Sequence, residues 1–115
     1  MKDTQSGQLL RIYLSEGDRC HHLPLYEALV KQARESGISG ATVLRGPLGY
    51  GQTSILHTAK ILRLSDDLPV VIEIVETAER IERFIPQVEK MAPDALVTLE
   101  NIQILRFKEP SPRQP

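Results

Sequence analysis

The sequence has no tryptophan, few other aromatic residues (two phenylalanines and three tyrosines), and a single cysteine, Cys20. One cysteine cannot form a disulfide within the chain, and this usage is typical of a reducing compartment. No apolar run approaches the roughly 18 residues that span a membrane, since the strongest run, residues 69–75, is interrupted by Glu73. The first residues also lack the apolar core of a secretory signal. We therefore expect a cytoplasmic protein.

An excess of charge of one sign is also missing. The 14 Lys and Arg residues nearly balance the 15 Asp and Glu residues, for a net charge of −1 at pH 7. This balance argues against a nucleic-acid binder that relies on a broad basic face. With 115 residues, the chain is long enough for one domain that buries its core without disulfides. We expect residues 8–107 to form it, between a flexible N-terminus, residues 1–7, and a flexible proline-rich tail, residues 108–115.

The chain between these ends alternates between strand and helix periodicities. The predicted strands lie at residues 9–14, 41–44, 56–64, 70–75 and 96–107. A polar turn at residues 65–69 is expected to join the third and fourth of them as a hairpin. A first helix is predicted from Pro24, which suits the first helical position, to Gly37, which fits a helix end.

A second helix gives the clearest helical pattern of the sequence. Thr77 is a plausible N-cap residue. The apolar stripe of this helix consists of Ile81, Phe84, Ile85 and Val88. Pro86 lies inside the helix and is expected to kink it, because proline removes one backbone hydrogen bond.

This order of elements predicts an α+β protein with a ferredoxin-like plait, βαββαβ with an extra hairpin strand. Two right-handed crossovers place both helices on one face of the sheet. The other face has no helix, yet residues 70–75 and 96–107 carry apolar side chains of both parities. Because exposed apolar surface invites aggregation, we expect copies of the same chain to cover it. A β-bulge that changes the parity is the alternative, and the pattern does not distinguish a dimer from a trimer.

A glycine-rich segment, residues 46–53, resembles a phosphate-binding P-loop, but Gln52 stands where the lysine belongs. The residues that follow predict a strand, not the helix N-terminus that such a loop needs. A flexible loop for a ligand or partner fits better, since Tyr50 adds an aromatic surface to the glycines. Positive charge that suits an anionic ligand comes from Arg45, Lys60 and Arg63. A plain bulged connection with a solvated sheet edge is the alternative.

Other reactive side chains form weaker patterns. Cys20, His21 and His22, with the distant His57, could suggest a soft-metal site, but consecutive side chains seldom converge on one ion. Cys20 also lacks the local signature of a catalytic nucleophile. The carboxylates within residues 15–18 fit a turn or a helix cap. We therefore predict no enzymatic activity, no catalytic residues and no metal site.

Six segments together form a pattern that is more specific than any one of them. They are residues 25–29, 40–46, 49–51, 55–59, 67–73 and 96–100. This set closely resembles the PII-like family known as domain of unknown function 190, and the resemblance covers residues 8–107. Because that family is similar to the PII signalling proteins, the resemblance implies a PII-like homotrimer with its sheets turned inward.

The resemblance also implies a function, namely regulation by a small anionic effector, such as an adenine nucleotide, that binds in clefts between subunits. The residues expected to bind it are Arg45, Gly46, Gly49, Tyr50, Gly51, Gln52, His57, Lys60 and Arg106. Residues 90–95 lack the glycines that hold phosphates in PII proteins, so a mononucleotide, another small anion or no ligand remains open. A partner protein would read the loop, and a membrane channel or transporter is the implied target. A ligand-free adaptor trimer and a metal-binding trimer are the alternatives.

Overall fold

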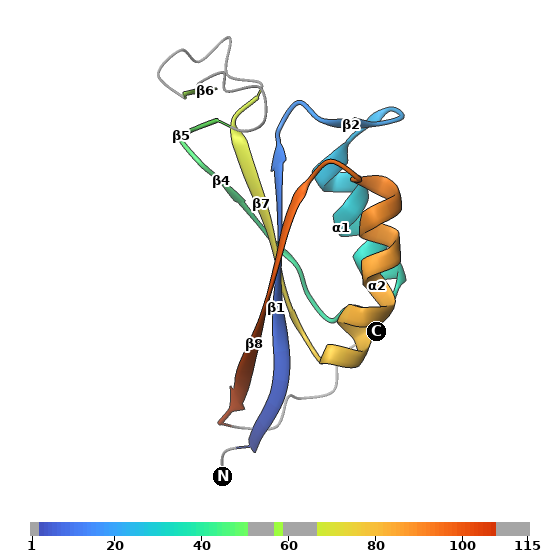
Figure 1. Ribbon diagram of the computed structural model, residues 1–115, viewed down its shortest axis with the longest axis vertical. Helices are drawn as coiled ribbons and strands as arrows, with labels where there is room; N and C mark the ends of the chain where they lie inside the picture. Colours follow the sequence, from blue (N-terminus) through green and yellow to red (C-terminus); the bar gives the residue numbers. More distant parts are fainter. Residues whose placement is uncertain (1–2, 51–56, 59–66, 108–115) are drawn as a thin grey trace.

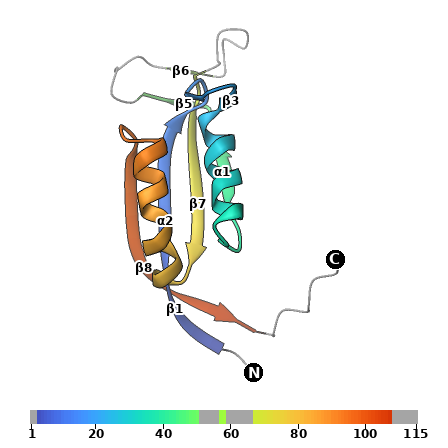
Figure 2. The same ribbon diagram turned by 90° about the vertical axis from the view of Figure 1, so that its right-hand side faces the viewer.

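The computed structural model describes residues 3–50, 57–58 and 67–107 of the chain. Two helices, α1 (Leu25–Glu35) and α2 (Ala78–Met91), lie side by side on one face of a four-stranded sheet (Figures 1 and 2). The strands are antiparallel, in the order β4 (Thr42–Arg45), β7 (Pro69–Glu76), β1 (Asp3–Ser15) and β8 (Leu96–Arg106). The predicted ferredoxin-like α+β fold is confirmed.

Helix α1 begins and ends close to the predicted positions. Pro24 is its N-cap residue, and its C-terminus is followed by Gly37 at a φ of +84°. Glycine adopts this left-handed conformation without steric cost, which is why it often follows a helix end. The side chains that α1 buries against the sheet are Leu25, Leu29 and Ala33.

Helix α2 is capped as the sequence predicts. The Thr77 hydroxyl accepts a hydrogen bond from the backbone N–H of Arg80 at 3.4 Å. The helix continues past Pro86, which lies on its exposed side, to Met91. The buried stripe of α2 consists of Ile81, Phe84 and Val88.

The hydrophobic core lies between the helices and one face of the sheet. The sheet side chains that it buries are Leu10, Ile12, Leu14, Val70, Ile72 and Ile74. Because successive residues of a strand point to opposite faces, the odd-numbered residues of β1 and β7 project away from the helices. We call this second side of the four-stranded sheet the open face, since neither α1 nor α2 covers it (Figure 2).

Two short hairpins lie beside the main sheet. β2 (Arg19–Cys20) pairs with β3 (Leu23–Pro24), and β5 (Leu48–Gly49) pairs with β6 (His57–Thr58). Of the strand predicted at residues 56–64, only β6 lies within the described residues. Its partner is β5 and not β7, because β7 already has β1 on one side and β4 on the other. The extra hairpin of the plait is therefore β5–β6.

Strand β1 is longer than the sequence pattern predicts. It begins at Asp3, inside segment 1–7, and its pairing with β8 runs from Asp3 opposite Arg106 to Tyr13 opposite Leu96. Backbone pairing with a distant strand holds this polar segment, and composition alone carries no information about such pairing. Within the described ranges, no helix is long and apolar enough to cross a membrane.

Candidate functional site

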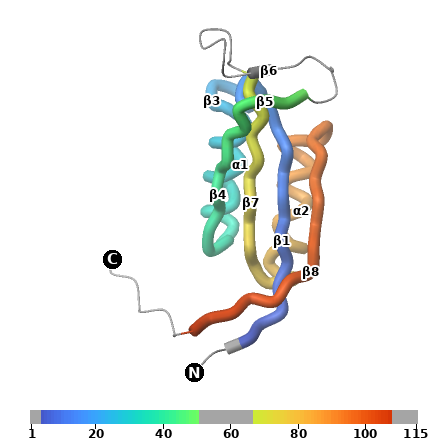
Figure 3. The backbone as a smooth tube through the Cα atoms, turned by 90° about the vertical axis from the view of Figure 1, so that its left-hand side faces the viewer, coloured from blue at the N-terminus to red at the C-terminus, as the bar shows by residue number. Residues whose placement is uncertain are grey.

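The glycine-rich segment lies at one end of the sheet, away from the start of β1 (Figures 1 and 3). It follows β4 directly. The backbone N–H of Gly46 donates to the carbonyl oxygen of Pro69 at 2.8 Å, which ties the segment to the start of β7. Gly49 then pairs with His57 in the β5–β6 hairpin. Backbone hydrogen bonds therefore hold the start of the predicted ligand loop against the start of β7 and against β6.

Close contact with Pro69 explains why two positions of the segment, Gly46 and Gly49, are occupied by glycine. A Cβ atom added at Gly46 would lie 3.0 Å from Cγ of Pro69, and one added at Gly49 would lie 2.9 Å from the same atom. Neither glycine is among those with a positive φ. The sequence pattern suggested backbone freedom as the reason for these glycines, whereas the structure shows close packing against a proline ring.

Arg45, the last residue of β4, has two protein partners. Its Nη2 atom lies 2.6 Å from Oε2 of Glu16 and donates to the hydroxyl of Tyr26 at 3.3 Å. The Arg45 side chain is nevertheless 53% exposed. An anion that reaches this guanidinium group therefore competes with Glu16 for it.

The side chain of Tyr50 is 70% exposed at the end of the described part of the loop. An exposed aromatic ring can stack against a planar ligand or a partner side chain. Gly51, Gln52 and Lys60 lie outside the described residues, and of His57 only the backbone is described. Their predicted roles stay predictions.

Arg106 is the last residue of β8 and pairs with Asp3 at the start of β1. This end of β8 lies at the opposite end of the sheet from β5 (Figure 1). Arg45 is level with Val70, which pairs with Leu14 of β1, whereas Arg106 pairs with Asp3. At 3.3 Å per residue, the segment of β1 between Asp3 and Leu14 spans on the order of 30 Å. The structure thus groups Arg45 with residues 46–50 and leaves Arg106 far from them within one chain.

Cross-strand pairing organises the open face into bands. The apolar band crosses all four strands next to the glycine loop and consists of Leu44, Val71, Tyr13 and Leu96. The polar band lies one row further along and consists of Thr42, Glu73, Arg11 and Thr98. The open face is therefore less uniformly apolar than the sequence analysis expected. The sequence shows each polar residue, but only the strand register shows that they align.

Arg11 is the centre of an ion-pair cluster on the open face. Its Nε atom lies 3.0 Å from Oε2 of Glu73, and its Nη1 atom lies 2.7 Å from Oε1 of Glu100. The hydrogen bond to Glu73 raises the pKa of Arg11 above its usual value; desolvation opposes this increase, and the hydrogen bond to Glu100 adds to it. One guanidinium between two carboxylates gives this cluster a net charge of −1.

Glu76 is a buried carboxylate at the other end of β7, with an exposed fraction of 5%. It accepts hydrogen bonds from the backbone N–H and hydroxyl of Ser39, at 2.8 and 2.9 Å, and from the N–H of Thr77 at 3.0 Å. Arg80 lies 3.7 Å away. Burial raises the pKa of Glu76, but these hydrogen bonds and the Arg80 charge together lower it below its usual value. The residue is structural, and sequence reasoning missed it.

The segment before α1 contains the short β2–β3 hairpin. The N–H of Ser15 donates to Oδ2 of Asp18 at 3.0 Å, which confirms the predicted turn. His21 has a φ of +56° at the tip of the β2–β3 hairpin, and Cys20 packs partly against the core. Among the residues that the structure describes, no three His, Cys, Asp or Glu side chains are close enough together to hold a metal ion.

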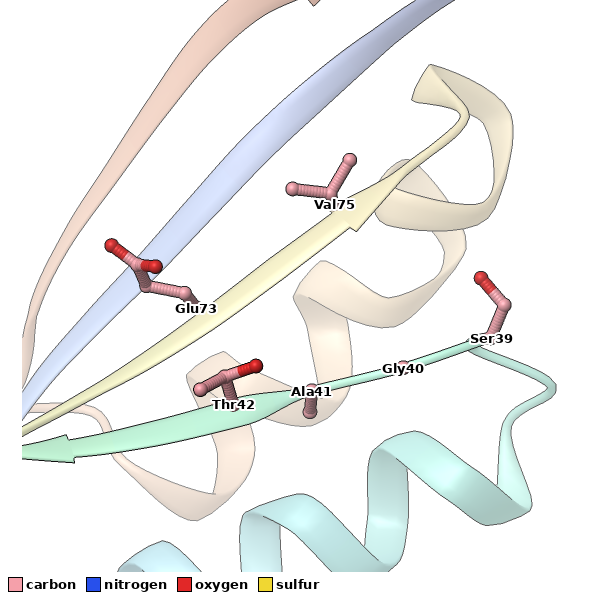
Figure 4. Close-up of a pocket in the computed structure, with 6 residues that line it drawn as sticks. All are labelled: Ser39, Gly40, Ala41, Thr42, Glu73 and Val75. Carbon is pink, nitrogen blue, oxygen red and sulfur yellow. The ribbon is translucent and has the colours of Figure 1, made fainter. Parts of the chain in front are cut away.

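A hollow of about 360 Å³ lies on the open face beside the start of β4 (Figure 4). Its lining residues are Ser39, Gly40, Ala41, Thr42, Glu73 and Val75. Glu73 is its only titratable residue, and this carboxylate already binds Arg11. The hollow lies toward the Glu76 end of β7, away from the glycine loop, so it is not part of the predicted ligand site.

Comparison with known proteins shows a family match and relatives that cover most of the chain. The family model of domain of unknown function 190 (DUF190), described as an uncharacterised ACR, matches residues 7–104. A UPF0166 protein of Aquifex aeolicus is 39% identical over 98 residues, which are 85% of this chain and 92% of that protein. A UPF0166 protein of Methanocaldococcus jannaschii is 36% identical over 101 residues, which are 87% of this chain and 93% of that protein.

Among solved structures, the fold is similar to that of CPII, a nitrogen regulatory PII-like protein from Thiomonas intermedia. That structure, bound to ADP, AMP and bicarbonate, aligns with a TM-score of 0.68 and 15% sequence identity. The match covers 89% of this chain and 91% of CPII. At this identity the likeness shows a shared PII-like fold.

Proposed function

This chain belongs to the DUF190 family, and we propose that it is a PII-like regulatory protein that binds a small anionic effector between copies of itself. An adenine nucleotide is the leading candidate, because the structurally similar CPII was solved with ADP and AMP. In our proposal, Arg45 and the loop that begins at Gly46 form one side of the site, and Arg106 of a second copy forms the other. The assembly is a homotrimer.

The separation of the two arginines carries this proposal. Arg45 and Arg106 lie at opposite ends of one sheet, so a single chain cannot bring both guanidinium groups to one small anion. The open face, with its exposed apolar band, gives a reason for copies of the chain to associate. Association supplies the second arginine from another copy.

The chemistry of the described residues favours an anion with a planar group. Guanidinium groups bind carboxylate and phosphate oxygens through paired N–H donors. The exposed ring of Tyr50 offers a surface on which a base can stack. The remaining predicted ligand residues, Gly51, Gln52, His57 and Lys60, follow Tyr50 in the sequence. This set binds and orients a ligand, which fits a regulatory protein rather than an enzyme.

The proposal includes a relay to a partner. A ligand that prefers one arrangement of the loop shifts the population of loop conformations in proportion to its differential affinity. The shifted loop then presents a different surface to a second protein, such as the membrane channel or transporter that the family resemblance implies.

Thermal unfolding with AMP, ADP, ATP and inorganic phosphate tests ligand binding. A ligand present at about 100 times its Kd stabilises the native state by about 2.7 kcal/mol, which raises Tm by on the order of 10 °C. Arg45→Gln and Arg106→Gln should each reduce the shift. Arg83→Gln, on the exposed side of α2, should leave it unchanged and serves as the matched control. No shift with any of these anions would argue against the ligand site.

A mixing experiment tests whether the site is shared between copies. Arg45→Gln and Arg106→Gln chains are denatured together, refolded and titrated with the anion that shifts Tm. If each site takes one arginine from each of two neighbouring copies in a ring, random mixing restores about a quarter of the sites. Restoration of none would mean that both arginines act within one chain or that neither binds ligand, and would contradict the shared site.

One observation favours a second candidate function, a trimeric adaptor without a small ligand. Arg45 is already bound to Glu16 and Tyr26, so its charge is partly satisfied by the chain itself. In this case the glycine loop contacts a partner protein directly. Glu16→Gln separates the two candidates, because release of Arg45 should tighten anion binding only if the anion uses that guanidinium group.

A further inference from the structure

The paired ends of β1 and β8 form an arm that leaves the body of the molecule. We define the arm as residues 3–7 of β1 and residues 102–106 of β8, which pair from Asp3 opposite Arg106 to Gly7 opposite Ile102. Figures 2 and 3 show this two-stranded ribbon bending away beyond the N-terminal start of α2, so neither helix covers it. β4 and β7 do not reach it either.

The arm carries apolar side chains on both of its sides. Ile102 and Ile104 share the open face, and Leu105, which is 52% exposed, points to the other side. Gly7 leaves space for Ile104, since a Cβ atom at Gly7 would lie 2.5 Å from Cδ1 of Ile104. A two-stranded ribbon alone is marginally stable in water. The arm therefore needs a covering partner that the described part of its own chain does not provide.

The apolar band at the other end of the open face also exposes large apolar side chains that its own chain does not cover. Its exposed fractions are 48% for Leu44, 37% for Tyr13 and 64% for Leu96. The net charge of −1 on the neighbouring Arg11 cluster complements the positive Arg106 at the end of the arm. In contrast, the hollow beside β4 is lined mainly by small or polar residues, with Val75 as its one large aliphatic side chain.

We propose that the arm of one copy docks on the apolar band of the next copy. This inference rests on the proposed function, because it names the contact that brings Arg106 of one copy to the loop end of another copy's sheet, where β4 ends at Arg45. The arm and the band are different surfaces of the chain, so the contact is head-to-tail, and rotational symmetry closes it into a ring. The polar band next to the apolar band then limits how far the arm can slide.

Disulfide trapping tests the contact directly. In a Cys20→Ser background, Leu105→Cys places a thiol on the arm and Leu44→Cys places one on the apolar band. Within one chain the two positions lie about 30 Å apart along the sheet, whereas Cα atoms joined by a disulfide are separated by at most about 7 Å. Any bond between them therefore joins two copies. We expect dimers and closed rings on non-reducing gels, and monomers after reduction.

A second cysteine pair tests the alternative docking place. Leu105→Cys with Val75→Cys is also too far apart to bond within one chain, since Val75 is level with Leu9 and Leu105 with Thr4. We expect at least tenfold less cross-linked product from this pair. If the Val75 pair cross-links more efficiently than the Leu44 pair, the arm docks in the hollow and our inference is wrong.

Charge substitutions test the contact without thiols. Leu105→Asp should lower the assembled fraction at least tenfold at equal protein concentration. Leu99→Asp is the matched control, since Leu99 is similarly exposed at 48% and lies opposite Leu10 on the helix side of the sheet, outside the arm, the apolar band and the glycine loop. Circular dichroism should show that both variants remain folded.

The outcomes separate this inference from the proposed function. If the chain assembles but the Leu44 pair does not cross-link and Leu105→Asp leaves the assembly intact, the arm contact is overturned while a shared ligand site stands. If the unmodified chain is a monomer at every concentration, both the arm contact and the shared site are wrong.

Discussion

At the scale of single residues, Glu76 connects the end of β7 to two other segments. Its carboxylate binds Ser39, before β4, and the N-cap residue of α2. Removal of a charged partner from a buried hydrogen-bond network costs about 1–3 kcal/mol. We expect Glu76→Gln to lower the free energy of unfolding by this amount at pH 7, as measured by urea denaturation. Glu82→Gln, exposed on α2, should have no effect.

The lowered pKa of Glu76 gives this difference a pH dependence. A carboxyl group with a lower pKa in the folded state stabilises the fold at pH values above its unfolded pKa. That contribution disappears as the pH falls below 4.5, the usual value, and through the folded pKa. The stability difference between wild type and Glu76→Gln should therefore shrink on acidification. A constant difference from pH 7 to pH 3 would contradict the ionised role of Glu76.

The contact between Gly49 and Pro69 makes a separate prediction. Gly49→Ala places a methyl group 2.9 Å from Cγ of Pro69 and should be destabilising. Overpacking of this kind costs about 1–3 kcal/mol. In a Pro69→Ala background, which removes Cγ, the same substitution should cost much less. Equal costs in both backgrounds, measured by a double-mutant cycle, would show that the proline ring is not the reason for the glycine.

At the scale of elements, the cap of α2 is the clearest local feature. Thr77→Ala removes the hydroxyl that accepts from Arg80 N–H and should reduce stability by about 1 kcal/mol. Thr77→Ser keeps an acceptor and should restore most of the loss. If alanine and serine are equivalent in urea denaturation, the hydroxyl does not cap the helix.

The elements also show which parts of the fold can be predicted from the sequence. Both helices were predictable because their caps and stripes are local, as Thr77, Pro24 and Gly37 illustrate. The extension of β1 to Asp3 could not be predicted, because it depends on backbone pairing with residues about 100 positions away. The pairing of β6 with β5 was missed for another reason: both sides of β7 are taken by β4 and β1, and a strand order is not visible in local sequence patterns.

The candidate site could also be predicted only in part: its residues could be identified, but their contacts could not. The sequence identified Arg45 and the glycine segment from their residue types. It did not show that Glu16 binds Arg45, that Pro69 packs against two of the glycines, or that Arg106 lies at the far end of the sheet. These facts depend on which distant residues the fold brings together, and spacing in a single sequence does not encode them.

At the scale of the whole molecule, the open face connects the fold to the proposed function. The same face carries an exposed apolar band, a central ion-pair cluster and, at its far end, the arm. A single chain leaves all three uncovered by its helices (Figure 2). Assembly through this face would cover them and bring the arm of one copy, which ends at Arg106, to the sheet of another copy.

Light scattering coupled to size-exclusion chromatography tests this account most directly. The unmodified chain, measured from micromolar to hundred-micromolar concentration, should give a mass of about 39 kDa, three times the 12.9 kDa of one chain. A mass of 12.9 kDa across that range would contradict the account, because a monomer has no second copy to supply Arg106.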